Sequence, residues 1–317
     1  MTQAAILVSA PYFSDDERAR IESVGPVVYA GTPAERAALP EDVRAAVRAI
    51  ANKGHKAIDG AQMDLFPNLE IIAQFGVGYD AIDVAAATER GIRVTNTPDV
   101  LNEDVADLAL AMMLAWSREI VKGDGWVRNG TWGKGKELPL NRKMSGAPVG
   151  IAGMGRIGRA IADRCAAFGM PVHYTSRTEK ETPAGWTYHG EDVVALAEAV
   201  DWMVVAVVGG DHTKGYLSRE AIQALGPRGV VINIARGTCV DEEALIEALE
   251  AGDIAGAGLD VFYGEPHVNP RLIALPNVLL QPHQASSTAE TRRDMSIAQC
   301  ANLAAYFDGA PLPTPVN

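Results

Sequence analysis

Residues 149–165 read VGIAGMGRIGRAIADRC, and this stretch decides the fold. An apolar run precedes Gly153, Gly155 and Gly158, which are spaced G-x-G-x-x-G, and a helical pattern follows them. The first glycine permits a tight turn, the second admits a pyrophosphate near the helix N-terminus, and the third lets helix and strand pack closely. A plain glycine turn and a methyltransferase loop are the alternatives. The strand-loop-helix placement disfavours the first, and the glycine spacing disfavours the second, so we predict a dinucleotide-binding loop.

Short apolar runs alternate with helical patterns along the 317 residues, which is typical of parallel sheets covered by helices. We therefore expect an α/β protein with two Rossmann-like lobes and a cleft between them. Residues 1–99 and 286–317 are expected to form a substrate-binding lobe, because the last helical pattern (288–307) would pack back on the first lobe. Residues 100–285 are expected to form the dinucleotide-binding lobe.

Individual elements follow from the same patterns. Ser14 and Glu17 form a capping box for the first helix, and residues 102–121 predict one long helix between the lobes. The predicted strands of the first lobe are 5–8, 26–29, 71–75 and 93–95. Those of the second lobe are 149–153, 172–176, 202–208, 229–235, 256–262 and 278–283.

The overall composition limits the possible partners. With 28 basic and 40 acidic residues the net charge is −12, which disfavours nucleic acid and anionic membrane surfaces. The N-terminal stretch reads as a strand and not as a signal peptide, and no apolar run approaches the roughly 20 residues of a membrane span. Cys165, Cys239 and Cys300 are far apart and lack metal-ligand spacing. We interpret them as packing residues in a reducing cytoplasm and predict no metal site.

The stretch HYTSR (173–177) bears on the choice of cofactor. An Asp or Glu that binds the ribose of NAD is expected about 20 residues after the glycine loop, but residues 175–178 contain no carboxylate. The Arg177 guanidinium can instead bind a 2′-phosphate, with the hydroxyls of Ser176 and Thr178 as further donors. We therefore predict NADPH, with NADH as a weaker alternative; a solvated Arg177 that tolerates both cofactors is the competing interpretation. The candidate cofactor-binding residues are Gly153, Gly155, Arg156, Ile157, Gly158, Ser176, Arg177, Thr178 and Ala235.

Three charged residues follow predicted strands of the second lobe. Arg236 can hold a carboxylate or polarise a carbonyl, His283 can transfer a proton, and Glu265 can orient the imidazole and stabilise its protonated form. Reacting groups gather beyond the carboxyl ends of strands in such sheets, so together these residues predict carbonyl reduction. Individually they could be a strand cap, a loop carboxylate and a residue that introduces the last helix. His212 and His267 are rival acids, but their polar, turn-like surroundings predict solvated side chains.

A glycine-rich turn in the first lobe is a candidate substrate site. Gly76, Val77 and Gly78 follow the strand 71–75, and the amides of Val77 and Gly78 could bind a substrate carboxylate. An ordinary turn is equally compatible with these residues. Across the expected cleft, this turn and Arg236 would hold the same small acid.

The chain resembles the D-isomer-specific 2-hydroxyacid dehydrogenase family over nearly its whole length. The resemblance lies in successive stretches that read QFGVGYDAIDV, VTNTPDVLNEDVADLALAMMLA, GIAGMGRIGRAIA, INIARGTCVDEEALIEAL, AGLDVFYGEP and LLQPHQASSTAETR. The stretch NTPDVLNEDVADLA and the Ser-Arg pair at 176–177 are most similar to the glyoxylate/hydroxypyruvate and hydroxyphenylpyruvate reductases. The resemblance to that branch also implies a preference for NADPH.

The resemblance implies roles at matching positions. His283 would be the acid/base, Glu265 its partner and Arg236 the substrate clamp, with the Val77 and Gly78 amides on the carboxylate. Asp260 would contact the nicotinamide carboxamide, although its place on an apolar strand also suits a buried structural acid.

The resemblance also implies a homodimer formed through an arm at about 118–147. Trp126 and Trp132 would anchor the arm, or would be ordinary core residues. The sequence departs from the family around residues 284–287 and at 238–239, which could reshape the substrate pocket.

We therefore expect an enzyme that transfers hydride from NADPH to glyoxylate or hydroxypyruvate and gives a D-2-hydroxyacid. A reductase of larger aromatic 2-oxoacids, such as hydroxyphenylpyruvate, is the enzyme alternative. A non-catalytic nicotinamide-sensing protein is the alternative from another class, but the joint presence of Arg236, Glu265 and His283 argues against it.

Overall fold

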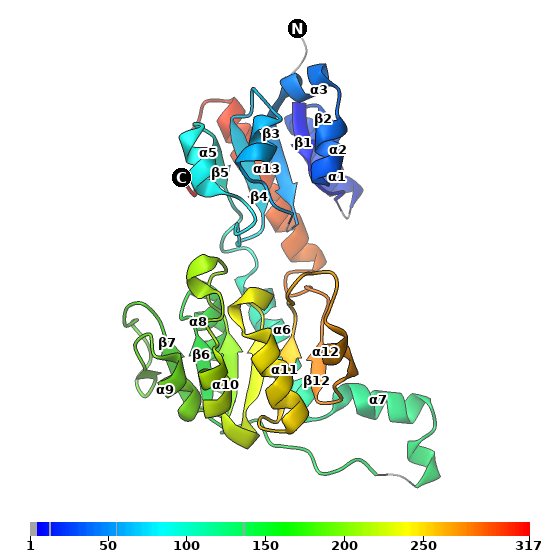
Figure 1. Cartoon of the computed structure of the whole chain (residues 1–317), viewed down its shortest axis with the longest axis vertical. Helices are drawn as coiled ribbons and strands as arrows, with labels where there is room; N and C mark the ends of the chain where they lie inside the picture. The colour runs from blue at the N-terminus through cyan, green and yellow to red at the C-terminus, as the bar shows by residue number, and fades with distance from the viewer. Residues whose placement is uncertain (1–4, 13, 55, 136) are drawn as a thin grey trace. The chain divides into compact units, whose positions relative to one another are not determined.

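The computed structural model describes residues 5–12, 14–54, 56–135 and 137–317 (Figure 1). The chain divides into two compact units, one made of Met1–Leu101 with Ser287–Asn317 and the other of Asn102–Ser286. Each unit contains a single parallel sheet. Two α/β units with parallel sheets were predicted, and this fold class is confirmed.

The first unit has a five-stranded sheet in the order β2-β1-β3-β4-β5. Its strands are β1 (Ala5–Val8), β2 (Val27–Tyr29), β3 (Val47–Lys53), β4 (Ile71–Phe75) and β5 (Arg93–Thr95). Its helices are α1 (Asp15–Val24), α2 (Pro33–Ala38), α3 (Glu41–Ala46), α4 (Gly60–Asp64), α5 (Val84–Glu89) and α13 (Ala289–Phe307). The capping box predicted at Ser14 and Glu17 is present at α1. Helix α13 returns from the far end of the chain to pack on α1 and β4.

The second unit has a seven-stranded sheet in the order β12-β11-β10-β9-β6-β7-β8. Its strands are β6 (Val149–Ala152), β7 (Val172–Thr175), β8 (Thr187–Tyr188), β9 (Trp202–Val205), β10 (Val230–Asn233), β11 (Gly256–Leu259) and β12 (Val278–Leu280). Because β6 lies between β7 and β9, the strand order reverses there, and the loop after β6 stands at the point where such sheets bind ligands.

Helices cover both faces of this second sheet. The longer ones are α6 (Asn102–Ser117), α8 (Arg156–Ala167) and α11 (Glu242–Ala251), and the shorter ones are α9 (Val193–Glu198), α10 (Arg219–Ala224) and α12 (Pro270–Ala274). Helix α7 (Ile120–Arg128) follows α6 and projects away from the sheet (Figure 1). On β11, Ala257 belongs to the apolar core of α9, α10 and α11, while a side chain at the next residue, Gly258, would meet Met112 of α6. Successive strand residues point to opposite faces, so α6 lies on the other face.

Two predictions about element boundaries were wrong. The helix predicted at 102–121 ends at Ser117, because Glu119 adopts a left-handed backbone (φ 46°) that starts α7 in a new direction. Every strand predicted for the second lobe ends earlier than predicted, by one residue for 149–153 and 172–176 and by two or three for 202–208, 229–235, 256–262 and 278–283; the remaining residues form loops at the carboxyl edge of the sheet.

Across the described parts of the chain, no helix is both long and apolar enough to cross a membrane. Over the same residues, no cluster of three or more His, Cys, Asp or Glu side chains is arranged to hold a metal ion.

Candidate active site

The glycine loop joins β6 to α8. A side chain at Gly153 (φ 104°) would lie 2.8 Å from the Ala206 carbonyl oxygen, and one at Gly158 would lie 2.0 Å from the Gly153 carbonyl oxygen. Both positions therefore exclude any larger residue. A side chain at Gly155, the N-cap of α8, would meet nothing within 4 Å. The open space over Gly155 at a helix N-terminus fits the pyrophosphate of a dinucleotide.

The turn after β7 carries the residues predicted to choose the cofactor. Ser176 Oγ donates to the Thr178 carbonyl (2.6 Å), and the Tyr188 hydroxyl donates to the Ser176 carbonyl (2.8 Å), so the backbone of this turn is held in place. Arg177 is exposed at its tip. Lys180 Nζ donates to Thr178 Oγ1 (3.1 Å), which brings a second cation to the turn. The sequence reasoning missed Lys180, although a basic residue just beyond Arg177 was the signal.

The loop after β10 fixes Arg236. Asn233 donates from Nδ2 to the Arg236 carbonyl (2.9 Å) and accepts the Ala235 amide (3.0 Å), which folds the backbone back on the strand end. Arg236 Nη1 donates to the Ala235 carbonyl (2.7 Å). A side chain at Gly209 would lie 2.5 Å from Arg236 Cγ, so the glycine makes room for the arginine side chain.

His283 and Glu265 meet in the loops after β12 and β11. The distance from His283 Nδ1 to Glu265 Oε2 is 2.7 Å, and the two side chains are 28% and 22% exposed. Glu265 Oε1 accepts the Phe262 amide (2.9 Å), which fixes the carboxylate. Because Glu265 engages Nδ1, Nε2 is the nitrogen that can deliver a proton to a substrate oxygen.

Asp260 holds the turn that carries His283. Its carboxylate is fully buried and accepts the amides of Gln284 (2.7 Å) and Ala285 (3.0 Å). The His283 amide donates to the Asp260 carbonyl (2.8 Å), and His283 has a positive φ of 53°. Burial raises the pKa of Asp260, and the two amide hydrogen bonds oppose that rise. Asp260 thus supports the histidine turn, while its contact with a nicotinamide stays a prediction.

The predicted carboxylate-binding turn lies in the first unit. Gly76 donates its amide to Thr97 Oγ1 (3.0 Å), and Asn96 Nδ2 donates to the Val77 carbonyl (2.9 Å), so the turn is tied to the chain after β5. Arg236, Glu265 and His283 belong to the second unit, and joint action of the two groups stays a prediction. The rival acids His212 and His267 are exposed, as expected.

Comparison with known proteins identifies dehydrogenases and reductases as similar to this chain. The family model described as "D-isomer specific 2-hydroxyacid dehydrogenase, NAD binding domain" matches residues 110–285. A hydroxyphenylpyruvate reductase of Plectranthus scutellarioides is 46% identical over 288 residues, which is 91% of each chain. The glyoxylate/hydroxypyruvate reductase A HPR2 of Arabidopsis thaliana is 47% identical over 285 residues, 90% of each. The structure of an NADPH-dependent glyoxylate/hydroxypyruvate reductase from Sinorhizobium meliloti, in complex with NADP and malonate, aligns with a TM-score of 0.92 and 43% identity over 98% of this chain and 96% of that one.

Proposed function

The chain belongs to the D-isomer-specific 2-hydroxyacid dehydrogenase family, and on that premise we propose that it reduces small 2-oxoacids such as glyoxylate and hydroxypyruvate with NADPH. The product is the 2-hydroxyacid, of D configuration where it is chiral. The observation that carries the proposal is the His283–Glu265 pair at 2.7 Å, in the same unit as the glycine loop and Arg236.

The residues divide the reaction between them. The glycine loop and the turn after β7 would hold NADPH, which would supply the hydride for the keto carbon. His283 gives the proton on Nε2 to the carbonyl oxygen, and Glu265 stabilises the protonated imidazole before the transfer. Arg236 holds the substrate carboxylate and polarises the carbonyl, and the amides of Val77 and Gly78 bind the same carboxylate. Orientation and preformed positive potential together lower the barrier.

The preference for NADPH rests on the turn after β7. Arg177 and Lys180 provide two cations, and Ser176 and Thr178 provide hydroxyls, where a carboxylate would repel a 2′-phosphate. NADH is expected to work less well. The S. meliloti reductase that is 43% identical is described as NADPH-dependent, which supports the same choice.

A substrate panel with both cofactors tests the proposal. We expect NADPH oxidation with glyoxylate and hydroxypyruvate, at a higher kcat/KM than NADH gives. A greater kcat/KM for hydroxyphenylpyruvate than for glyoxylate and hydroxypyruvate would favour the aromatic alternative. The 46% identity to a hydroxyphenylpyruvate reductase supports that alternative. No oxidation with any 2-oxoacid would refute the reductase and leave a nicotinamide-sensing protein.

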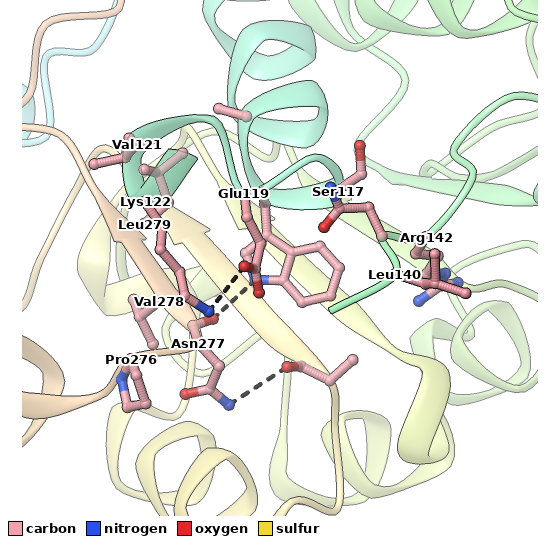
Figure 2. A pocket seen from close by; sticks show the side chains of 14 residues that line it. Ser117, Glu119, Val121, Lys122, Leu140, Arg142, Pro276, Asn277, Val278 and Leu279 are labelled. Atoms are coloured by element: carbon pink, nitrogen blue, oxygen red, sulfur yellow. Dashed lines mark hydrogen bonds and ion pairs between the residues drawn. The ribbon is translucent and has the colours of Figure 1, made fainter. Parts of the chain in front are cut away.

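We further propose a homodimer formed through residues 118–147. This segment exposes large apolar side chains at Ile120, Val121, Val127, Trp132 and Leu140. A groove of about 660 Å³ lies where α6, α7 and the chain around residue 140 meet the β12 edge of the sheet (Figure 2). Its wall includes Trp116, whose Nε1 donates to the Asn277 carbonyl (2.9 Å), and the Lys122–Glu119 ion pair (2.9 Å). A second copy of this chain brings a matching apolar segment to cover this surface.

The test of the dimer is the molar mass in solution, measured by light scattering after size exclusion. We expect a dimer that Leu140→Arg shifts toward monomer, because Leu140 is fully exposed within the segment. Ile297→Arg is the matched control, since Ile297 is an exposed apolar residue outside it. A monomeric wild-type protein would contradict the proposal.

We also propose a cytoplasmic location. Cys165, Cys239 and Cys300 are buried thiols that form no disulfide, which suits a reducing compartment. Fractionation of the source cells checks this, and recovery in a membrane or secreted fraction would contradict it.

A further inference from the structure

Two cations lie against the ring of Phe75 in the first unit. Lys53 Nζ is 5.3 Å from the ring centroid and Arg292 Cζ is 5.7 Å from it. Phe75 is buried at the end of β4, and Lys53 is its register partner at the end of β3. Arg292 comes from the first turn of α13. We call Lys53 and Arg292 the Phe75 cation pair.

The Phe75 cation pair stands beside the turn proposed to bind the substrate carboxylate. The chain runs from Phe75 directly into Gly76, Val77 and Gly78, and all of these residues belong to the first unit. They gather at the carboxyl edge of a parallel sheet, which is where such sheets bind ligands. The turn proposed to bind a small acid therefore begins directly after the residue whose ring lies against both cations.

Both cations are fixed by neighbours. Lys53 Nζ donates to the Pro11 carbonyl (2.7 Å) and also lies over the Tyr12 ring, 5.1 Å from its centroid. Arg292 Nη2 donates to Ser287 Oγ (2.7 Å). Side chains held in this way lose little further freedom when a ligand binds, so the Phe75 cation pair is preorganised.

Opposing electrostatic interactions act on the Phe75 cation pair. Arg292 repels Lys53, and the Glu17 carboxylate attracts both side chains. Burial lowers the pKa of Lys53 to about 8, and the like charge of Arg292 contributes to the decrease. An incoming anion relieves this repulsion, because it favours the charged form of both side chains.

We propose that the Phe75 cation pair binds an anionic or hydroxyl group at the far end of the substrate, and so selects 2-oxoacids with a polar terminus over those with an apolar one. The inference rests on the proposed reductase activity and adds a specificity determinant to it. Glyoxylate has no terminal group and serves as the reference substrate.

The experiment compares oxaloacetate, hydroxypyruvate and 2-oxobutyrate with glyoxylate at saturating NADPH and pH 7. For the wild type we expect kcat/KM for oxaloacetate to exceed that for 2-oxobutyrate by about tenfold or more, as one charge-assisted contact gives. Lys53→Gln and Arg292→Gln should each lower the oxaloacetate/glyoxylate ratio of kcat/KM by about tenfold. Lys53→Arg keeps the charge and should restore most of the ratio.

Matched controls come from neighbouring residues. Lys56→Gln removes an exposed lysine three residues after Lys53. Arg293→Gln removes an exposed arginine adjacent to Arg292; the Arg293 side chain pairs with Asp294 at 3.0 Å. Both should leave the oxaloacetate/glyoxylate ratio as in the wild type.

Several outcomes would overturn the inference. Equal losses for glyoxylate and oxaloacetate in Lys53→Gln and Arg292→Gln would assign these residues a purely structural role. If either variant fails to fold, the wild-type enzyme still tests the inference, because equal kcat/KM for oxaloacetate and 2-oxobutyrate would contradict it. Equal values for these two substrates would leave the proposed reduction of glyoxylate intact. A wild-type protein that reduces none of the four acids would refute the reductase itself.

Discussion

Replacing Glu265 with glutamine removes one negative charge from the catalytic pair and nearly preserves its shape. Glu265 Oε2 lies 2.7 Å from His283 Nδ1, and both side chains are mostly buried, so solvent screens the interaction only in part. A hydrogen bond to a charged group contributes about 1.5–3 kcal/mol, which corresponds to a roughly 10- to 150-fold change in an equilibrium or a rate. We expect kcat/KM for glyoxylate reduction at pH 7 to fall by about this factor.

The control for this test is Glu242→Gln. Glu242 accepts the Tyr263 amide (3.3 Å) in the same loop, much as Glu265 accepts the Phe262 amide, and it is not paired with His283. We expect Glu242→Gln to leave kcat/KM for glyoxylate reduction close to that of the wild type. A Glu265→Gln enzyme with wild-type kcat/KM would refute the assigned partnership of Glu265 and His283.

Three further predictions follow from the cofactor turn, the histidine turn and the Phe75 cation pair. Arg177→Ala should lower kcat/KM with NADPH about tenfold or more and change that with NADH little; an unchanged cofactor ratio would show that Arg177 is merely solvated. Asp260→Ala leaves the Gln284 and Ala285 amides without their carboxylate, so chemical denaturation should show a loss of about 1–3 kcal/mol for each amide; wild-type stability would contradict this. The oxaloacetate/glyoxylate ratio of kcat/KM should fall as pH rises through about 8, because the Lys53 ammonium then loses its proton; Glu17, Arg292 and the Tyr12 ring surround this group. A ratio of kcat/KM that stays constant from pH 7 to 9 would count against the role of Lys53.

Some of the site could be predicted because single residues determine it. The steric demands at Gly153 and Gly158 and the open space at Gly155 are properties of the glycines themselves, so spacing alone indicated the loop. Arg236, Glu265 and His283 were proposed because each follows a predicted strand, and parallel strands end at the same edge of a sheet.

Other features depend on contacts between segments that are distant in sequence. Strand β3 was missed because VRAIANK continues a helical pattern and contains polar residues, one of which, Asn52, is buried against Gln74 of β4 (2.6 Å). Lys53 and Arg292 meet only because α13 returns to the first unit. The support of the His283 turn by Asp260 depends on a loop conformation with positive φ, for which the sequence gives no glycine signal.

The central claim is that His283 supplies the proton for reduction of the 2-oxoacid. Its most direct test is kcat for glyoxylate with NADPH in the His283→Ala enzyme, with the NADPH Kd measured on the same preparation. General acid catalysis predicts a roughly 100- to 10,000-fold loss of kcat and an NADPH Kd close to that of the wild type. Wild-type turnover in His283→Ala would contradict the claim.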